Sequence, residues 1–153
     1  VTMTGSAAGA NAVIGIFANN IYVLILTILF SLTFGSGAMF ILVWNASVIA
    51  AAIGIFSKNY SIGEGILCGV LRYMIFHGIL EIGAYFIGAL AGGIISVAVI
   101  RKDLRGEGMW KVLQDALILI IIAIVLLIVA ALVEVYLTKD IMAFISKIGI
   151  CAK

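Results

Sequence analysis

The chain's one histidine lies close to a carboxylate in an otherwise apolar segment. His77 precedes Glu81 by four residues. A helix turns by about 100° per residue, so residues at this spacing share one face. Ionisable side chains inside a membrane are costly unless they face protein or water. The pair therefore indicates a face that contacts other parts of the protein rather than lipid.

Three kinds of chemistry are open to this pair. It could ligate a metal, relay protons, or form a structural polar clasp by hydrogen-bonding to Asn45 across helices. A structural zinc site needs four ligands and a catalytic one needs three and a water, whereas the chain has no second histidine. We therefore favour an intramembrane polar clasp of Asn45, His77 and Glu81. We keep an ion or proton pathway as the alternative, and we expect no metal, no cofactor and no catalytic residue.

Small residues at four-residue spacing follow the same helical face beyond Glu81. Such spacing lets two helix backbones approach closely in a membrane. The first series comprises Ala84, Gly88 and Gly92, and a second series comprises Ala46, Ala50 and Gly54. We predict that both series pack helices together, and that the first one forms the contact of a homodimer.

The composition is that of an integral membrane protein. Of its 153 residues 65% are hydrophobic and 10% are charged, there is no proline, and the mean hydropathy is +1.36. A typical soluble domain is about 45–50% apolar and about 25% charged. The net charge of +2 comes from scattered basic residues, which predicts no nucleic-acid surface. Cys68 and Cys151 are too few to define a disulfide framework, and we expect ordinary buried thiols.

The distribution of apolar residues predicts an all-α, polytopic transmembrane helix bundle of about four spans. Residues 21–56 carry no charge, and as one helix they would measure about 54 Å, well beyond the hydrocarbon core of about 30 Å. Glycine at 35 and 37 is the natural break. We expect an N-terminal lead-in at 1–19, spans at about 20–35, 38–56, 78–100 and 113–137, an interfacial amphipathic helix at about 61–76, and an amphipathic tail at 138–153.

Orientation in the membrane rests on the basic residues beside the spans. Four of them lie within 101–111, the clearest hydrophilic connection of the chain. Because positive charge near span ends favours the cytoplasmic side, we predict that this loop is cytoplasmic.

The first residue is Val1, and no basic segment of a signal peptide precedes the apolar residues.

Three segments in order resemble the stage II sporulation protein M family of bacterial and archaeal membrane proteins. They are the FANNI stretch at 17–21, the glycine-interrupted run followed by Asn45, and the HGILE stretch at 77–81 leading to glycines at 88, 92 and 93. The resemblance covers about residues 17–137. The chain departs from the family pattern at Phe76, where proline is usual, and at Ala46, where glycine is usual.

This resemblance implies a multi-pass protein of a bacterial or archaeal cell membrane that acts as a scaffold or assembly partner rather than an enzyme. The expected partners are membrane lipid, a second copy of the chain and other membrane proteins. The alternative is an ion or proton channel or transporter-like unit that uses Asn45, His77 and Glu81. The two differ in whether the charge of Glu81 is needed, or only its packing and hydrogen bonds.

Overall fold

A computed structural model describes residues 5–35, 38–58, 62–71, 78–101 and 107–147. Every regular element within these ranges is helical. The elements are α1 (Gly5–Phe34), α2 (Ala38–Ser57), α3 (Ile62–Val70), α4 (Ile79–Ile100), α5 (Glu107–Leu132), the short π-helix η2 (Val133–Leu137) and α6 (Thr138–Lys147). Four segments are long and apolar enough to cross a membrane: Gly9–Phe34, Ala38–Ile55, Ile79–Ile100 and Gly108–Leu137. The predicted all-α, four-span fold is confirmed.

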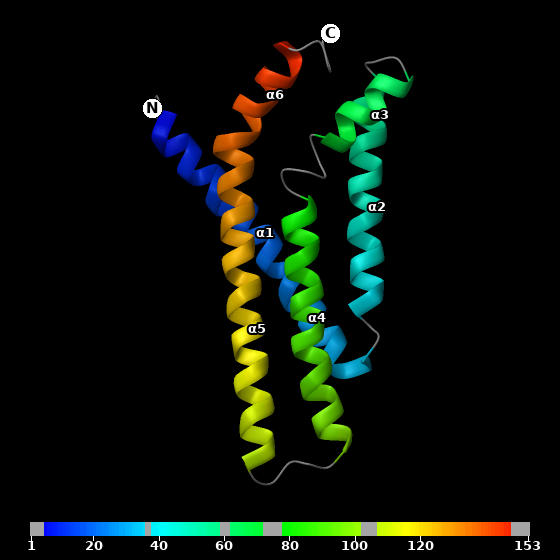
Figure 1. Ribbon diagram of the computed structural model, residues 1–153, viewed down its shortest axis with the longest axis vertical. Coiled ribbons are helices and arrows are strands. Elements are labelled where there is room, and N and C mark those ends of the chain that lie inside the picture. Colours follow the sequence, from blue (N-terminus) through cyan, green and yellow to red (C-terminus); the bar gives the residue numbers. More distant parts are fainter. Residues whose placement is uncertain (1–4, 36–37, 59–61, 72–77, 102–106, 148–153) are drawn as a thin grey trace.

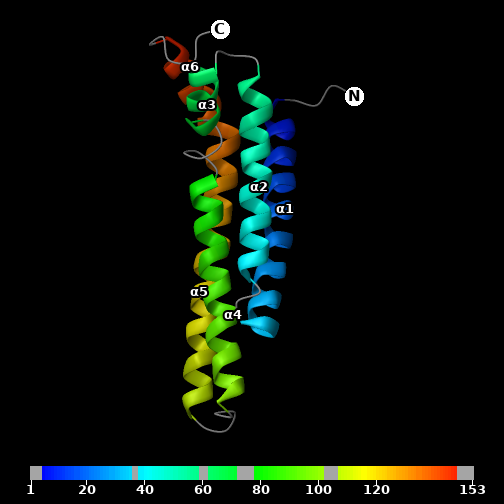
Figure 2. The same cartoon turned by 90° about the vertical axis from the view of Figure 1, so that its right-hand side faces the viewer.

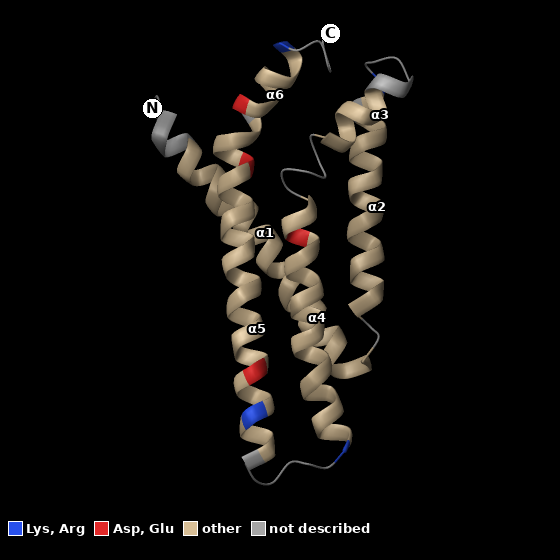
Figure 3. Cartoon of the chain, in the orientation of Figure 1, with Lys and Arg blue, Asp and Glu red and all other residues tan. Residues whose placement is uncertain are grey.

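The spans form an elongated bundle with two different ends (Figures 1 and 2). The N-terminal part of α1 lies at one end, together with α3 and α6. At the other end the adjoining ends of α4 and α5 extend beyond those of α1 and α2. Charged side chains are sparse in the described helices, and α4 carries one acidic band within its apolar length (Figure 3). The long apolar surfaces between the ends are therefore the part suited to lipid.

Helix α1 begins earlier than the sequence predicts. It starts at Gly5, whereas the span is expected from about residue 20, after Asn19. The preceding residues are rich in alanine, the best helix former, and no proline interrupts them. Both asparagines therefore lie inside a long helix, where their side chains can reach neighbouring helices.

Helix α3 packs closely against the end of α2 through two glycines. A Cβ built on Gly65 would lie 2.6 Å from the backbone oxygen of Ser57, and one on Gly69 would lie 2.9 Å from Ile53 Cγ2.

Between these two glycines, Cys68 is 1% exposed and disulfide-bonded. The expectation of an ordinary thiol is wrong for Cys68, because spacing along the chain does not report distance in space. Cys151, and residues 61 and 72–76 of the expected amphipathic helix, lie outside the described residues.

The core lies where α1, α4 and α5 meet. It is built around Leu24, Ala84, Tyr85, Ala123 and Leu127, each at most 2% exposed. On α5 the buried positions Ala116, Ala123 and Ala130 recur every seven residues, which is the seam spacing of closely packed helices. Small side chains on α5 and α4 thus let these two neighbours come together over most of their shared length.

The contact between α1 and α4 depends on glycines of α4. A Cβ on Gly92 would lie 2.6 Å from the backbone oxygen of Ile28, and one on Gly88 would lie 2.4 Å from Leu24 Cδ1. Gly88 and Gly92 therefore pack within a single chain. The predicted dimer contact through this series is not available in this fold, because α1 already occupies the face.

We expect the two glycines to differ in their tolerance of alanine. Gly92→Ala should lower the free energy of unfolding by about 1–3 kcal/mol, the usual cost of overpacking, because a backbone carbonyl cannot move aside. Gly88→Ala should cost less, since the end of the Leu24 side chain can rotate. Unfolding in mixed detergent micelles measures both.

Gly83 provides the control for this series. A Cβ there meets no atom within 4 Å, so Gly83→Ala should stabilise the helix by roughly 0.5–1 kcal/mol through its higher helix propensity. Equal effects at Gly83 and Gly92 would contradict the close approach of α1 and α4.

Candidate functional site

A hydrogen-bonded group of three polar side chains connects α1 to α4. Asn20 Nδ2 donates to Glu81 Oε1, and Tyr85 Oη donates to Asn20 Oδ1 at 3.0 Å. Asn20, Glu81 and Tyr85 are 4%, 5% and 2% exposed, respectively. One amide therefore bridges a carboxylate and a phenol that are both removed from lipid and water.

The local sequence explains how these side chains meet. Glu81 and Tyr85 are four residues apart on α4 and so share one face. That face continues into Ala84, Gly88 and Gly92, all buried, so α1 can lie close enough for a short asparagine side chain to reach it. The glycine contact and the polar contact belong to the same helix pair.

The three side chains line a partly open cavity of about 360 Å³, whose other lining residues include the exposed Asn19 and Val48. Its walls come from α1, α2, α4 and η2. The polar residues that line it are Asn19, Asn20, Asn45, Glu81, Tyr85 and Glu134, and the apolar ones are Gly15, Ile16, Val48, Ile49 and Ile82. Two carboxylates and three carboxamides thus face one space within the membrane-spanning part of the chain.

The structure places two members of the predicted clasp at this cavity. Asn45 and Glu81 both line it, although Asn45 Nδ2 donates to the carbonyl of Ile41 in its own helix, at 2.9 Å. His77 lies outside the described residues. The hydrogen-bonded partners of the described site are instead Asn20 and Tyr85.

Sequence reasoning missed Asn20, Tyr85 and Glu134 as site residues. The sequence does indicate Tyr85, because it lies four residues after Glu81, just as His77 lies four residues before Glu81. Asn20 becomes a candidate only when α1 is extended to Gly5, because it then lies in the middle of a span. Glu134 lies in η2, and π-helical turns are frequent at functional sites.

The second series of small residues lies on a different surface. Ala46, Ala50 and Gly54 are exposed on α2, and a Cβ on Gly54 would meet no atom within 4 Å. Within the described chain these residues therefore face outward. Ala84, Gly88 and Gly92, by contrast, are all buried.

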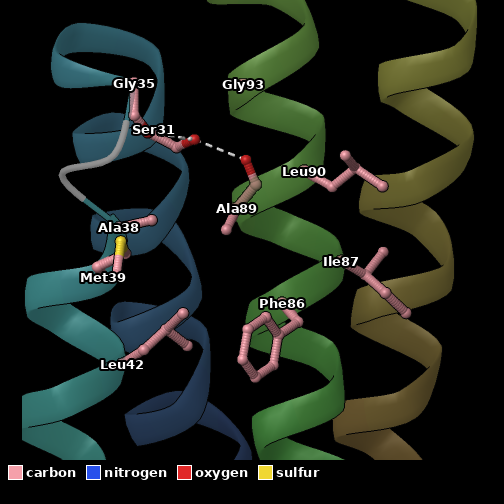
Figure 4. A pocket seen from close by; sticks show the side chains of 10 residues that line it. All are labelled: Ser31, Gly35, Ala38, Met39, Leu42, Phe86, Ile87, Ala89, Leu90 and Gly93. Atoms are coloured by element: carbon pink, nitrogen blue, oxygen red, sulfur yellow. Dashed lines mark hydrogen bonds between the residues drawn. The ribbon is translucent and has the colours of Figure 1, made fainter.

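An apolar groove of about 540 Å³ lies beyond the polar cavity, beside Gly35 at the end of α1 and Ala38 at the beginning of α2 (Figure 4). Ser31 Oγ donates to the carbonyl of Ala89 at 2.6 Å within it. Its other labelled side chains, including Leu42, Phe86 and Leu90, are apolar. A second space of about 460 Å³ shares Gly35, Leu90 and Gly93 with it and continues to Ile100. The polar lining is thus concentrated at one level of the bundle.

The chemistry of the cavity is that of hydrogen bonding and oxygen ligation. Among the described residues no group of three or more His, Cys, Asp or Glu side chains could hold a metal ion. A closed zinc site needs four ligands of such types. Carboxylate, amide and phenol oxygens can instead receive protons, water or a weakly held cation.

The fold and this polar cavity define a polytopic helical membrane protein. Over residues 3–139 the chain matches the family described as Stage II sporulation protein M, and it belongs to that family. A relative is an uncharacterized protein of Methanocaldococcus jannaschii, which is 31% identical over 137 residues, covering 85% of this chain and 72% of the relative. No solved structure matches the chain.

The hydrogen bonds of Asn20 should be energetically coupled. Tyr85→Phe removes one bond and should lower the free energy of unfolding by about 0.6 kcal/mol, the average for a membrane side-chain hydrogen bond. Asn20→Ala removes both bonds and should cost more. In the Asn20→Ala background, Tyr85→Phe should have almost no further effect, as a double-mutant cycle in micelles would measure.

Tyr22 supplies a matched control for this cycle. Its side chain is 70% exposed on α1, so Tyr22→Phe should leave stability unchanged in either background. Strictly additive effects of Asn20→Ala and Tyr85→Phe would contradict the observed contact.

Proposed function

We propose that this protein is a membrane scaffold that packs with itself or with partner membrane proteins through the outer face of α2. One observation carries the proposal. Only 6% of the most apolar window of α2 is buried within the chain, against 39% for α4. We assign no catalytic activity to the chain.

The side chains on the outer face of α2 suit contact with another helix. Ala46, Ala50 and Gly54 are exposed there, and small residues at this spacing permit close backbone approach. Without a hydrophobic driving force inside the bilayer, helices associate through such close packing. The face therefore fits a second transmembrane helix better than it fits disordered lipid chains.

The alternative, an ion or proton conducting unit, draws support from the polar cavity, which both Asn45 and Glu81 line. Conduction also needs a path for the ion across the whole bilayer. The grooves that continue along α4 toward Ile100 are lined mainly by apolar side chains. This distribution favours the scaffold.

We infer that the protein is a multi-pass protein of a bacterial or archaeal cell membrane, with the segment 101–111 in the cytoplasm. The basic residues of this segment support the assignment through the positive-inside rule. The disulfide-bonded Cys68 lies in α3, at the opposite end of the bundle (Figure 1). Disulfides persist mainly on the oxidising side of a membrane, so the two indications agree.

The scaffold proposal predicts that bulk on the outer face of α2 blocks association without unfolding the chain. Gly54→Leu should reduce site-specific cross-linking in native membranes by roughly tenfold, a loss of about 1.4 kcal/mol, because the larger side chain holds the helices apart. The thermal stability of the isolated chain should not fall, since Gly54 has open space around it and leucine is a better helix former than glycine.

Gly83→Leu is the matched control, because Gly83 also has open space around it but lies on α4. It should leave cross-linking at α2 unchanged. Undiminished assembly of Gly54→Leu in membranes would remove the support for a scaffold that acts through α2.

The orientation predicts which positions react from outside the cell. Lys111→Cys, at an exposed site on α5, should react with a membrane-impermeant maleimide only after the membrane is permeabilised. Lys58→Cys, an exposed site at the other end of the bundle, should react in intact cells. The reverse pattern would invert the orientation.

A further inference from the structure

We propose that an apolar groove along α4 holds one acyl chain of an anionic phospholipid, whose headgroup lies at Arg101. The groove consists of the two spaces of about 540 and 460 Å³ that share Gly35, Leu90 and Gly93, the first of which is shown in Figure 4. None of the small residues on the outer face of α2 lines it, so the inference does not depend on the scaffold role.

The last two turns of α4 extend beyond the adjoining ends of α1 and α2 (Figures 1 and 2). Gly35 directly follows α1 and lines both spaces together with Gly93, so α1 ends at about the level of Gly93. Arg101 lies eight residues beyond Gly93, which is about 12 Å along a helix. Over that distance Val97 and Ile100 are 48% and 75% exposed, within an apolar span that continues to Ile100. Lipid must therefore fill the space beside this part of α4.

The walls of the groove suit a hydrocarbon chain. The hydroxyl of Ser31 donates to the carbonyl of Ala89 at 2.6 Å, and the other side chains shown in Figure 4 are apolar. Apolar cavities stay dry, so water does not occupy such a space. A helix with its side chains is about 10–12 Å wide, whereas α2 contacts α4 directly. A third helix therefore does not fit between them, but a single acyl chain does.

The length of the groove matches one leaflet of a bilayer. The hydrocarbon core is about 30 Å thick, so the tails of one leaflet cover about 15 Å. A tail that starts beside Ile100 would end near Leu90, because ten helical residues also measure about 15 Å. Leu90 lies where the two spaces join, and the space toward Phe86 can receive the end of a longer tail.

The charges at this end of the bundle favour an anionic headgroup. Arg101 directly follows Ile100, which lines the groove, and it is exposed. Lys111, also exposed, lies near the beginning of α5, and basic side chains occur at this end of both helices (Figure 3). Residues 101–111 carry four basic and two acidic side chains. Because a tail gains nothing from the hydrophobic effect within a bilayer, the contact of Arg101 with the phosphate and the fit of the tail determine binding.

Retention of lipid by the purified chain tests the headgroup contact. The full chain in detergent micelles is mixed with phosphatidylglycerol or phosphatidylcholine of identical acyl chains, and native mass spectrometry measures the bound lipid. We expect the chain to retain a single phosphatidylglycerol in preference to phosphatidylcholine. Arg101→Gln should lower this preference about fivefold, the effect of one basic side chain near an anionic lipid. Lys147→Gln removes an exposed charge of α6, at the other end of the bundle, and should leave the preference unchanged.

A second pair of variants tests the position of the tail. Leu90 lines both spaces and is 55% exposed, so Leu90→Trp should fold, fill the groove and remove most of the bound phosphatidylglycerol. Val99→Trp is the matched control, because Val99 is also exposed on α4 but lines neither space. It should retain the lipid. Gly54→Leu, the assembly variant, should retain it too, which separates a failure of the lipid site from a failure of the scaffold.

Three results would overturn the proposal. The first is equal retention of the two lipids by the wild type, which would make the contact with lipid unspecific. The second is unchanged retention of phosphatidylglycerol by folded Leu90→Trp. The third is displacement of the lipid by inorganic phosphate, which would assign the site to a free anion.

Discussion

The close approach of α1 and α4 is the contact on which the rest of the structure depends. At Gly92 a single added Cβ would lie 2.6 Å from a backbone carbonyl of α1, so the distance between these helices is set by the absence of a side chain. That distance lets Asn20 reach both Glu81 and Tyr85. A bulkier face on α4 would hold the two helices apart. The amide of Asn20 would then no longer reach the carboxylate of Glu81.

A second constraint is the cost of an ionisable side chain within a membrane. Glu81 lies in a span and is 5% exposed, and such a group persists only where protein or water solvates it. The chain supplies that environment from four elements, with amides from α1 and α2, a phenol from α4 and a further carboxylate from η2. The bundle thus assembles a polar interior from helices that are otherwise apolar.

Much of the architecture could be predicted from the sequence, because membrane thickness fixes the length of a span. The runs of apolar residues identify all four spans, and the small residues beyond Glu81 identify a packing face. What that face contacts could not be read, since a series such as Ala84, Gly88 and Gly92 suits a partner within the chain as well as a second copy. Asn20 could not be identified as a site residue, because the predicted span begins at about residue 20, and only the helical start at Gly5 places this asparagine inside a span.

Helix α2 connects the interior of the protein to its surface. Asn45 and Gly54 are nine residues apart, which is about 180° around the helix axis at about 100° per residue, so one residue lines the cavity while the other faces outward. α2 is also the span with the smallest buried share, and within the described chain it contacts α3, α1 and α4. A displacement of α2 would move the cavity wall and the outer face together, because both belong to one helix.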